Sequence, residues 1–156
     1  MTTLEGLRLV LALVLGVNAA QAQVTATGCT VVKKVTTCNW ESFRKEVASA
    51  HAVKAEYSQM DRNTGSQLKE LAKELGKTVV NGNETADLTF TVVPADISGM
   101  DVGPADEEIL ELRVYSGNSS KESLVWVETY RGQKDRSWPA NVHAAIQQFR
   151  ERLVKQ

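Results

Sequence analysis

The residues best suited to chemistry form an acidic segment between residues 96 and 108, with five carboxylates in thirteen positions. Carboxylates that alternate along a loop with a glycine at its tight turn bind calcium, and only Asp101-Val102-Gly103 hints at that spacing. Paired carboxylates can also hydrolyse a glycoside, but only at a defined separation across the substrate. We expect a solvated loop that leads into a strand, and we assign no metal ligand and no cofactor. The carboxylates are Asp96, Asp101, Asp106, Glu107 and Glu108.

The two histidines, His51 and His143, lie in segments with helical spacing. A serine–histidine–acid site would need a serine and an acid beside one of them. The sequence has no G-x-S-x-G, H-E-x-x-H or C-x-x-C motif and no phosphate-binding glycine loop. We therefore assign no catalytic residue. A small secreted hydrolase that uses residues 96–108 or His143 is kept as the alternative function.

A second candidate site is the basic and aromatic segment 130–139, which joins a predicted strand to the last predicted helix. Arginine and aromatic residues are over-represented at binding hot spots, and an arginine can pair with a phosphate or a carboxylate. The alternative is a turn in which Trp138 packs against the core while the charges stay solvated. The predicted ligand- or partner-binding residues are Arg131, Lys134, Arg136 and Trp138.

The start of the chain has the pattern of a secretory signal peptide. Arg8 supplies a positive charge, Leu9 to Val17 is apolar, and Ala20-Gln21-Ala22 is a small-x-small cleavage site. The apolar run is about half the length that a membrane-spanning helix needs. We expect cleavage after Ala22, a periplasmic or secreted protein, and no integral membrane segment afterwards.

Cys29 and Cys38 are the only cysteines, and export makes a disulfide between them the expected state. A reactive cysteine pair or half of a metal site is the alternative. Ala26-Thr27-Gly28-Cys29 also loosely matches a lipobox, which would make Cys29 an acylated N-terminus and the protein a lipid-anchored envelope protein. The expected organisation is a signal peptide at 1–22, a disulfide-closed segment at 23–38 and one domain at 39–156.

The composition fits an ordinary globular domain without an affinity for nucleic acid. Removing residues 1–22 from the 156-residue chain leaves about 134, enough for one core. The formal net charge is −1, and it remains −1 because the leader contains one acid and one base. A chain this close to neutral has no basic surface for nucleic acid or an anionic membrane.

The apolar spacing predicts the order α-β-α-β-β-β-α, an α+β domain. Asn39 is expected to cap the first helix and Thr64 with Gln67 to form a capping box for the second, at about 65–75. Residues 110–115 and 124–130 are predicted to form a β-hairpin, and the last helix should start near Pro139. The simplest architecture is a mostly antiparallel sheet of about four strands with helices on one face.

This layout resembles small uncharacterised bacterial envelope proteins, some of them lipoproteins. The resemblance lies in Ala86-Asp87-Leu88-Thr89-Phe90, Leu112-Arg113-Val114-Tyr115, Leu124-Val125-Trp126 and Trp138-Pro139, and it covers about residues 50 to 155. It implies a bacterial source, an exported location and an interaction role. We therefore predict an exported non-enzymatic module that binds another envelope protein or a small ligand, with no catalytic residue to transfer.

Overall fold

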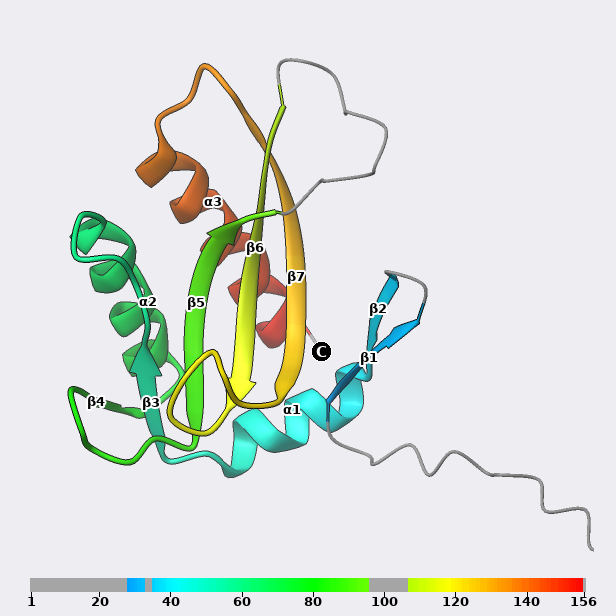
Figure 1. Ribbon diagram of the computed structural model, residues 1–156, viewed down its shortest axis with the longest axis vertical. Coiled ribbons are helices and arrows are strands. Elements are labelled where there is room, and N and C mark those ends of the chain that lie inside the picture. Colours follow the sequence, from blue (N-terminus) through cyan, green and yellow to red (C-terminus); the bar gives the residue numbers. More distant parts are fainter. Residues whose placement is uncertain (1–27, 33–34, 96–106, 156) are drawn as a thin grey trace, which may run out of the picture.

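The computed structural model describes residues 28–32, 35–95 and 107–155 (Figure 1). Its main feature is a five-stranded sheet in the order β4-β3-β5-β6-β7. The strands are β3 (Ala52–Ala55), β4 (Thr78–Val80), β5 (Leu88–Pro94), β6 (Glu107–Ser116) and β7 (Leu124–Gln133). The helices are α1 (Trp40–Ser49), α2 (Arg62–Glu74) and α3 (Trp138–Val154).

The α+β class is confirmed, but the sheet is mixed and has five strands instead of about four. β5, β6 and β7 are antiparallel, including the predicted hairpin, whereas β3 is parallel to both β4 and β5. For β4 the reason is its connection to β3, which runs through α2, and residues 81–87 then return the chain so that β5 also runs parallel to β3. A helical crossover returns the chain to the same end of the sheet, so the next strand runs parallel.

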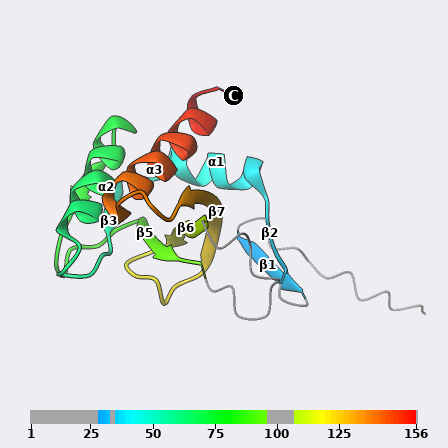
Figure 2. The same cartoon turned by 90° about the horizontal axis from the view of Figure 1, so that it is seen from above.

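The three helices cover one face of the sheet (Figure 2). α2 packs against β3, β4 and β5, while α3 packs against β6 and β7, and α1 contacts β7. Their apolar faces meet alternate residues of the strands in one core. The largest fully buried side chains are Phe43, Phe90, Phe149, Leu68, Leu71, Leu88, Leu110, Leu112, Val53, Val114, Val125 and Val142.

Two of the helix boundaries follow local signals in the sequence. The side chain of Asn39 accepts a hydrogen bond from the Ser42 N–H and caps α1, as predicted. Gly76 follows α2 with φ +73°, a conformation that favours glycine. The predicted start of α2 was wrong, because Asp61, not Thr64, is the N-cap residue.

The segment before α1 forms a small separate hairpin of β1 (Cys29–Val32) and β2 (Val35–Cys38). A disulfide joins Cys29 to Cys38, which are paired across the hairpin. The hairpin lies against β7 at one edge of the main sheet. In the described residues, no helix is both long enough and apolar enough to cross a bilayer.

Candidate functional site

A cleft of about 440 Å³ opens where β3 ends beside β5, and we call it the β5 cleft. Its walls come from three places that are far apart in the sequence. They are the segment from the end of β3 to the first turn of α2, the end of β5, and the start of α3. The lining residues are Glu56, Tyr57, Ser58, Asp61, Thr64, Thr91, Val92, Val93, Pro94 and Trp138.

The floor of the β5 cleft is a stretch of β5 that, in the described part of the chain, has a neighbouring strand on one side only. β3 pairs with β5 as far as Ala55 opposite Phe90, and one more bond follows from the Glu56 N–H to the Phe90 carbonyl, at 2.9 Å. β5 then continues to Pro94 beside β6 alone. The cleft therefore lies along an open sheet edge four residues long.

Asp61 connects α2 to the start of α3 beside the β5 cleft. One of its oxygens, Oδ1, accepts the Thr64 N–H at 3.2 Å, and Oδ2 accepts the Thr64 hydroxyl and the Trp138 Nε1–H, both at 2.6 Å. Burial raises the pKa of Asp61, but the hydrogen bonds from Thr64 and Trp138 outweigh it and leave the pKa below the ordinary value of 3.8. The carboxylate is consequently ionised at neutral pH.

Within the described residues, the acidic side chains of the cleft lining have no cationic partner. The Glu56 carboxylate accepts the N–H and the hydroxyl of Ser120, at 2.8 and 2.5 Å. Among the described residues, neither Glu56 nor Asp61 forms an ion pair, and no lysine or arginine lines the cleft. The described lining thus contains two acidic residues, Glu56 and Asp61, and no lysine or arginine, and the Glu56 carboxylate is held by Ser120.

Tyr57 is a second aromatic residue of the cleft lining besides Trp138, and Gly65 in α2 makes room for its ring. A Cβ atom at Gly65 would lie 2.4 Å from Tyr57 Cε1, so no other residue fits there without moving the ring. The ammonium of Lys69 lies over the ring at 5.4 Å from its centroid and reaches the Tyr57 hydroxyl at 3.4 Å. Tyr57 remains 36% exposed, which leaves it available for contact.

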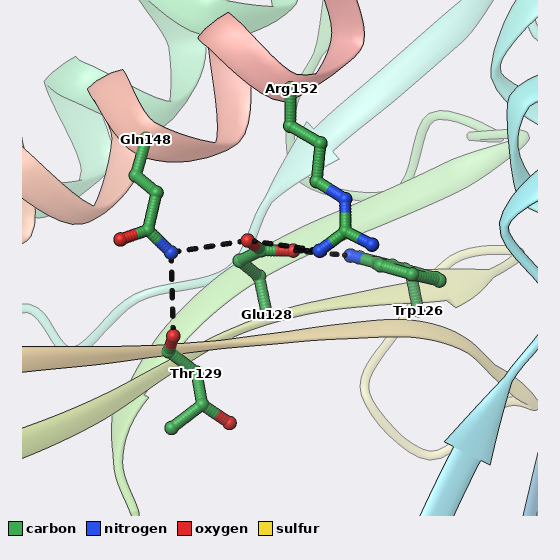
Figure 3. Close-up of polar contacts among 5 residues, drawn as sticks. All are labelled: Trp126, Glu128, Thr129, Gln148 and Arg152. Carbon is green, nitrogen blue, oxygen red and sulfur yellow. Dashed lines mark hydrogen bonds and ion pairs between the residues drawn. The ribbon is translucent and has the colours of Figure 1, made fainter.

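A second polar cluster lies under α3 and is structural (Figure 3). The buried carboxylate of Glu128 accepts from Trp126 Nε1 at 3.2 Å, Gln148 Nε2 at 3.1 Å and Arg152 Nη1 at 3.2 Å. The guanidinium of Arg152 in turn lies over the rings of Trp40 and Trp126. With both oxygens occupied, Glu128 serves as an anchor that holds α3 on β7 and not as an acid or base for a substrate.

The structure separates the four predicted binding residues. Trp138 lines the β5 cleft. Arg131 is exposed near the end of β7, and Lys134 and Arg136 are exposed in the turn before α3, outside the cleft lining. Asp61 and Tyr57, which also line the cleft, were not among the residues predicted from the sequence. An aspartate directly before a helical pattern is an N-cap signal that could have drawn attention to Asp61.

Among the described residues of the alternative hydrolase, Glu108 and His143 are not brought together. Residues 96–106 and the Glu107 side chain lie outside the described part, and Glu108 accepts a hydrogen bond from Asn141 Nδ2 at 2.5 Å. His143 is two residues further along α3, about 200° around the helix from Asn141. It lines a smaller groove with α2 residues such as Glu70 and Glu74. Glu108 therefore contacts the side of α3 that carries Asn141, whereas His143 lies on a different side of the helix.

No family model and no curated protein matches the chain. Among solved structures, it is similar to a minor lipoprotein from Acinetobacter baumannii, with 15% identity, a TM-score of 0.37, and coverage of 67% of this chain and 93% of the lipoprotein. It is also similar to a DUF330 protein from Xanthomonas campestris, with 15% identity, a TM-score of 0.33, and coverage of 78% and 85%.

Both similar structures are bacterial proteins, and one is a lipoprotein. The expected resemblance to small bacterial envelope proteins is therefore confirmed at the level of these neighbours, at low identity. The function proposed below depends on this chain's own residues, because likeness at these TM-scores carries no information about a site.

Proposed function

We propose that this protein is an exported, non-enzymatic binding module that holds part of another envelope protein in the β5 cleft. The observation that carries the proposal is the meeting of Tyr57, Trp138 and the ionised Asp61 around one cavity. Aromatic side chains supply large contact areas at binding hot spots, and an unpaired carboxylate selects for a complementary charge. The described lining contains no histidine or cysteine.

Export is supported by two features. The first 22 residues have the pattern of a cleavable leader, and the disulfide between Cys29 and Cys38 is a bond typical of oxidising compartments. The same disulfide uses the thiol that acylation would need, which favours cleavage after Ala22 over a lipid anchor at Cys29. The intact mass of the mature protein tests this, because a product starting at Cys29 with added lipid would contradict the proposal.

Cross-linking in living cells tests the binding role. A photoreactive phenylalanine replaces Tyr57 at the cleft, and in a control strain it replaces Lys45, which is exposed on α1. We expect the Tyr57 position to yield a discrete adduct with an exported protein, because a side chain on the cleft wall touches whatever the cleft holds. Mass spectrometry of the adduct identifies the partner.

The substitution Trp138→Ala, introduced together with the probe at position 57, is the matched control for cleft binding. It removes an aromatic wall, so we expect the adduct to fall at least about fivefold. Identical adducts from positions 57 and 45, or an adduct that does not respond to Trp138→Ala, would contradict the proposal. An adduct with a small molecule alone would replace the protein partner by the small ligand considered above.

A further inference from the structure

We infer that the partner segment binds in the β5 cleft as an added β-strand beside Val92, and that it carries a basic side chain that pairs with Asp61. This inference rests on the proposed function and adds the mode of binding and the chemistry of the partner. It follows from the direction of the backbone groups along β5, from the way the other sheet edges are covered, and from the charge of the cleft.

The backbone of β5 offers hydrogen bonds to an added strand. Along a strand, the N–H and C=O groups of successive residues point to opposite sides. The Ala95 N–H bonds the Ile109 carbonyl of β6, so Val93 and Thr91 also point to β6. Phe90, Val92 and Pro94 therefore point to the opposite side, where β3 has ended.

Of these groups, only the Phe90 carbonyl has a backbone partner beyond the end of β3, the Glu56 N–H. The Val92 N–H and the carbonyls of Val92 and Pro94 have no backbone partner in the described residues, and they face the β5 cleft. One donor and two acceptors in this order match the backbone of an extended peptide. Pro94 has no N–H, which ends the possible pairing at that residue.

The other edges of the sheet are protected, which makes the opening at β5 distinctive. β4 has only three residues. Two features cover the edge at β7. The β1–β2 hairpin lies against this strand, and the side chain of Gln148 donates a hydrogen bond to the Thr129 carbonyl at 3.4 Å. Short edges and covered edges are the usual means of preventing unwanted strand pairing. In the described residues, no strand, hairpin or backbone partner covers β5 on this side between Thr91 and Pro94, although the Thr91 and Val92 side chains are themselves buried.

The charge of the cleft specifies the occupant further. Asp61 uses three hydrogen bonds to hold Thr64 and Trp138, yet no base neutralises it in the described residues. Glu56 is a second acidic residue of the lining, but both oxygens of its carboxylate are bound to Ser120, so Asp61 carries the charge argument. A lysine or arginine on the added strand would supply the missing positive charge, whereas an acidic segment would be repelled.

A phage-displayed library of eight-residue peptides, selected on the purified mature protein, provides the probe. We expect enriched peptides with alternating apolar residues and one lysine or arginine. Synthetic copies are then methylated at one backbone nitrogen at a time. If the peptide pairs with β5, methylation should weaken binding at least about tenfold at every second residue near the centre and have little effect at the residues between.

The charge pairing is tested with Asp61→Asn, which keeps an N-cap acceptor, and with Asp135→Asn as a matched control on the exposed β7–α3 turn. We expect Asp61→Asn to weaken binding of the basic peptides about three- to tenfold and to reduce its salt dependence, and Asp135→Asn to leave both unchanged. Thermal unfolding of both variants shows whether each is folded.

The outcomes separate this inference from the proposed function. Three results would overturn the added strand. They are a methylation scan without a two-residue period, enrichment of acidic peptides, and the absence of any enriched peptide. The Tyr57 cross-link and its loss in Trp138→Ala could still support a cleft partner of another shape. A dimer in analytical ultracentrifugation that dissociates on Val92→Pro would replace the foreign strand by a second copy of this chain.

Discussion

The indole Nε1 of Trp138 donates a hydrogen bond of 2.6 Å to Oδ2 of Asp61, across 77 positions of the sequence. The bond joins the first residue of α3 to the N-cap residue of α2. One carboxylate thus satisfies backbone and side-chain donors of one helix and positions the aromatic wall contributed by the other. Stability and the shape of the β5 cleft consequently depend on the same side chain.

We expect Asp61→Ala to lower the free energy of unfolding by about 1–2 kcal/mol, since the Thr64 N–H and the indole N–H both lose their acceptor. Urea unfolding measures the change, with Asp135→Ala as the control for removal of an exposed carboxylate. The free energy of unfolding of Asp61→Asn should lie between those of Asp61→Ala and Asp135→Ala, because an asparagine oxygen can still cap α2. Equal stability of Asp61→Ala and the wild type would contradict this role.

Asp87 should make stability depend on acid pH. The backbone N–H groups of Ala52 and His51 donate to its Oδ2 at 2.9 and 2.7 Å, and these bonds lower the pKa of Asp87 below 3.8. A carboxylate with a lowered folded-state pKa stabilises the protein above its unfolded pKa, and this contribution disappears as the pH falls through the folded pKa.

The measurement for Asp87 is the difference in urea midpoint between the wild type and Asp87→Asn. We expect it to be constant near neutral pH and to shrink once the pH falls below about 3.8. Asp135→Asn, which alters a carboxylate in an exposed turn, provides the reference curve. A difference that grows on acidification would show that the hydrogen bonds do not favour the ionised form.

Gly65→Ala should have opposite effects in two backgrounds. In the wild type, the new Cβ would lie 2.4 Å from Tyr57 Cε1, so the ring must move and we expect destabilisation and a weaker Tyr57-side contact in the cleft. In the Tyr57→Ala background, the clash is absent and the better helix propensity of alanine should stabilise α2 by about 0.5–1 kcal/mol. Stabilisation in both backgrounds would mean that the ring moves aside without cost.

Glu128→Ala should cost about 3 kcal/mol, because Trp126, Gln148 and Arg152 lose a shared buried acceptor. Arg152→Ala should cost less, about 1–2 kcal/mol, since the Arg152 side chain is 44% exposed and water can solvate part of the site. Arg152→Lys keeps the charge and reduces the stacking on Trp40. Chemical denaturation of all three variants ranks them, and the opposite order would contradict Glu128 as the centre of the cluster.

The combined substitution of Arg131, Lys134 and Arg136 by alanine tests the basic turn predicted from the sequence. We expect a stability change of at most about 1 kcal/mol, because all three side chains are exposed and contacts of exposed charges contribute little. As these residues lie outside the cleft lining, peptide binding should be kept while the cross-link to the whole partner weakens at low salt. An unchanged cross-link at every salt concentration would remove these residues from the interface.

The elements of this protein were largely predictable because their signals are local. Asn39 caps α1 through a neighbour three residues away, and Gly76 ends α2 through its own φ angle. The β6–β7 hairpin follows from alternating residues on either side of a short turn. The parallel position of β3 was not predictable, because it depends on where the α2 crossover returns the chain and on which strands become neighbours.

The candidate site likewise combines residues that the sequence indicated with residues that only the folded chain brought together. Trp138 was singled out from its residue type and its place beside a charged turn, and in the folded chain it lines the β5 cleft. The α+β class followed from the apolar spacing, and the disulfide between Cys29 and Cys38 was expected from the leader and the cysteine count. Asp61, Tyr57 and Val92 became a site only in the folded chain. The physical reason is that an open strand edge is defined by the neighbour it lacks, and that absence is set by tertiary packing and not by the local sequence of β5.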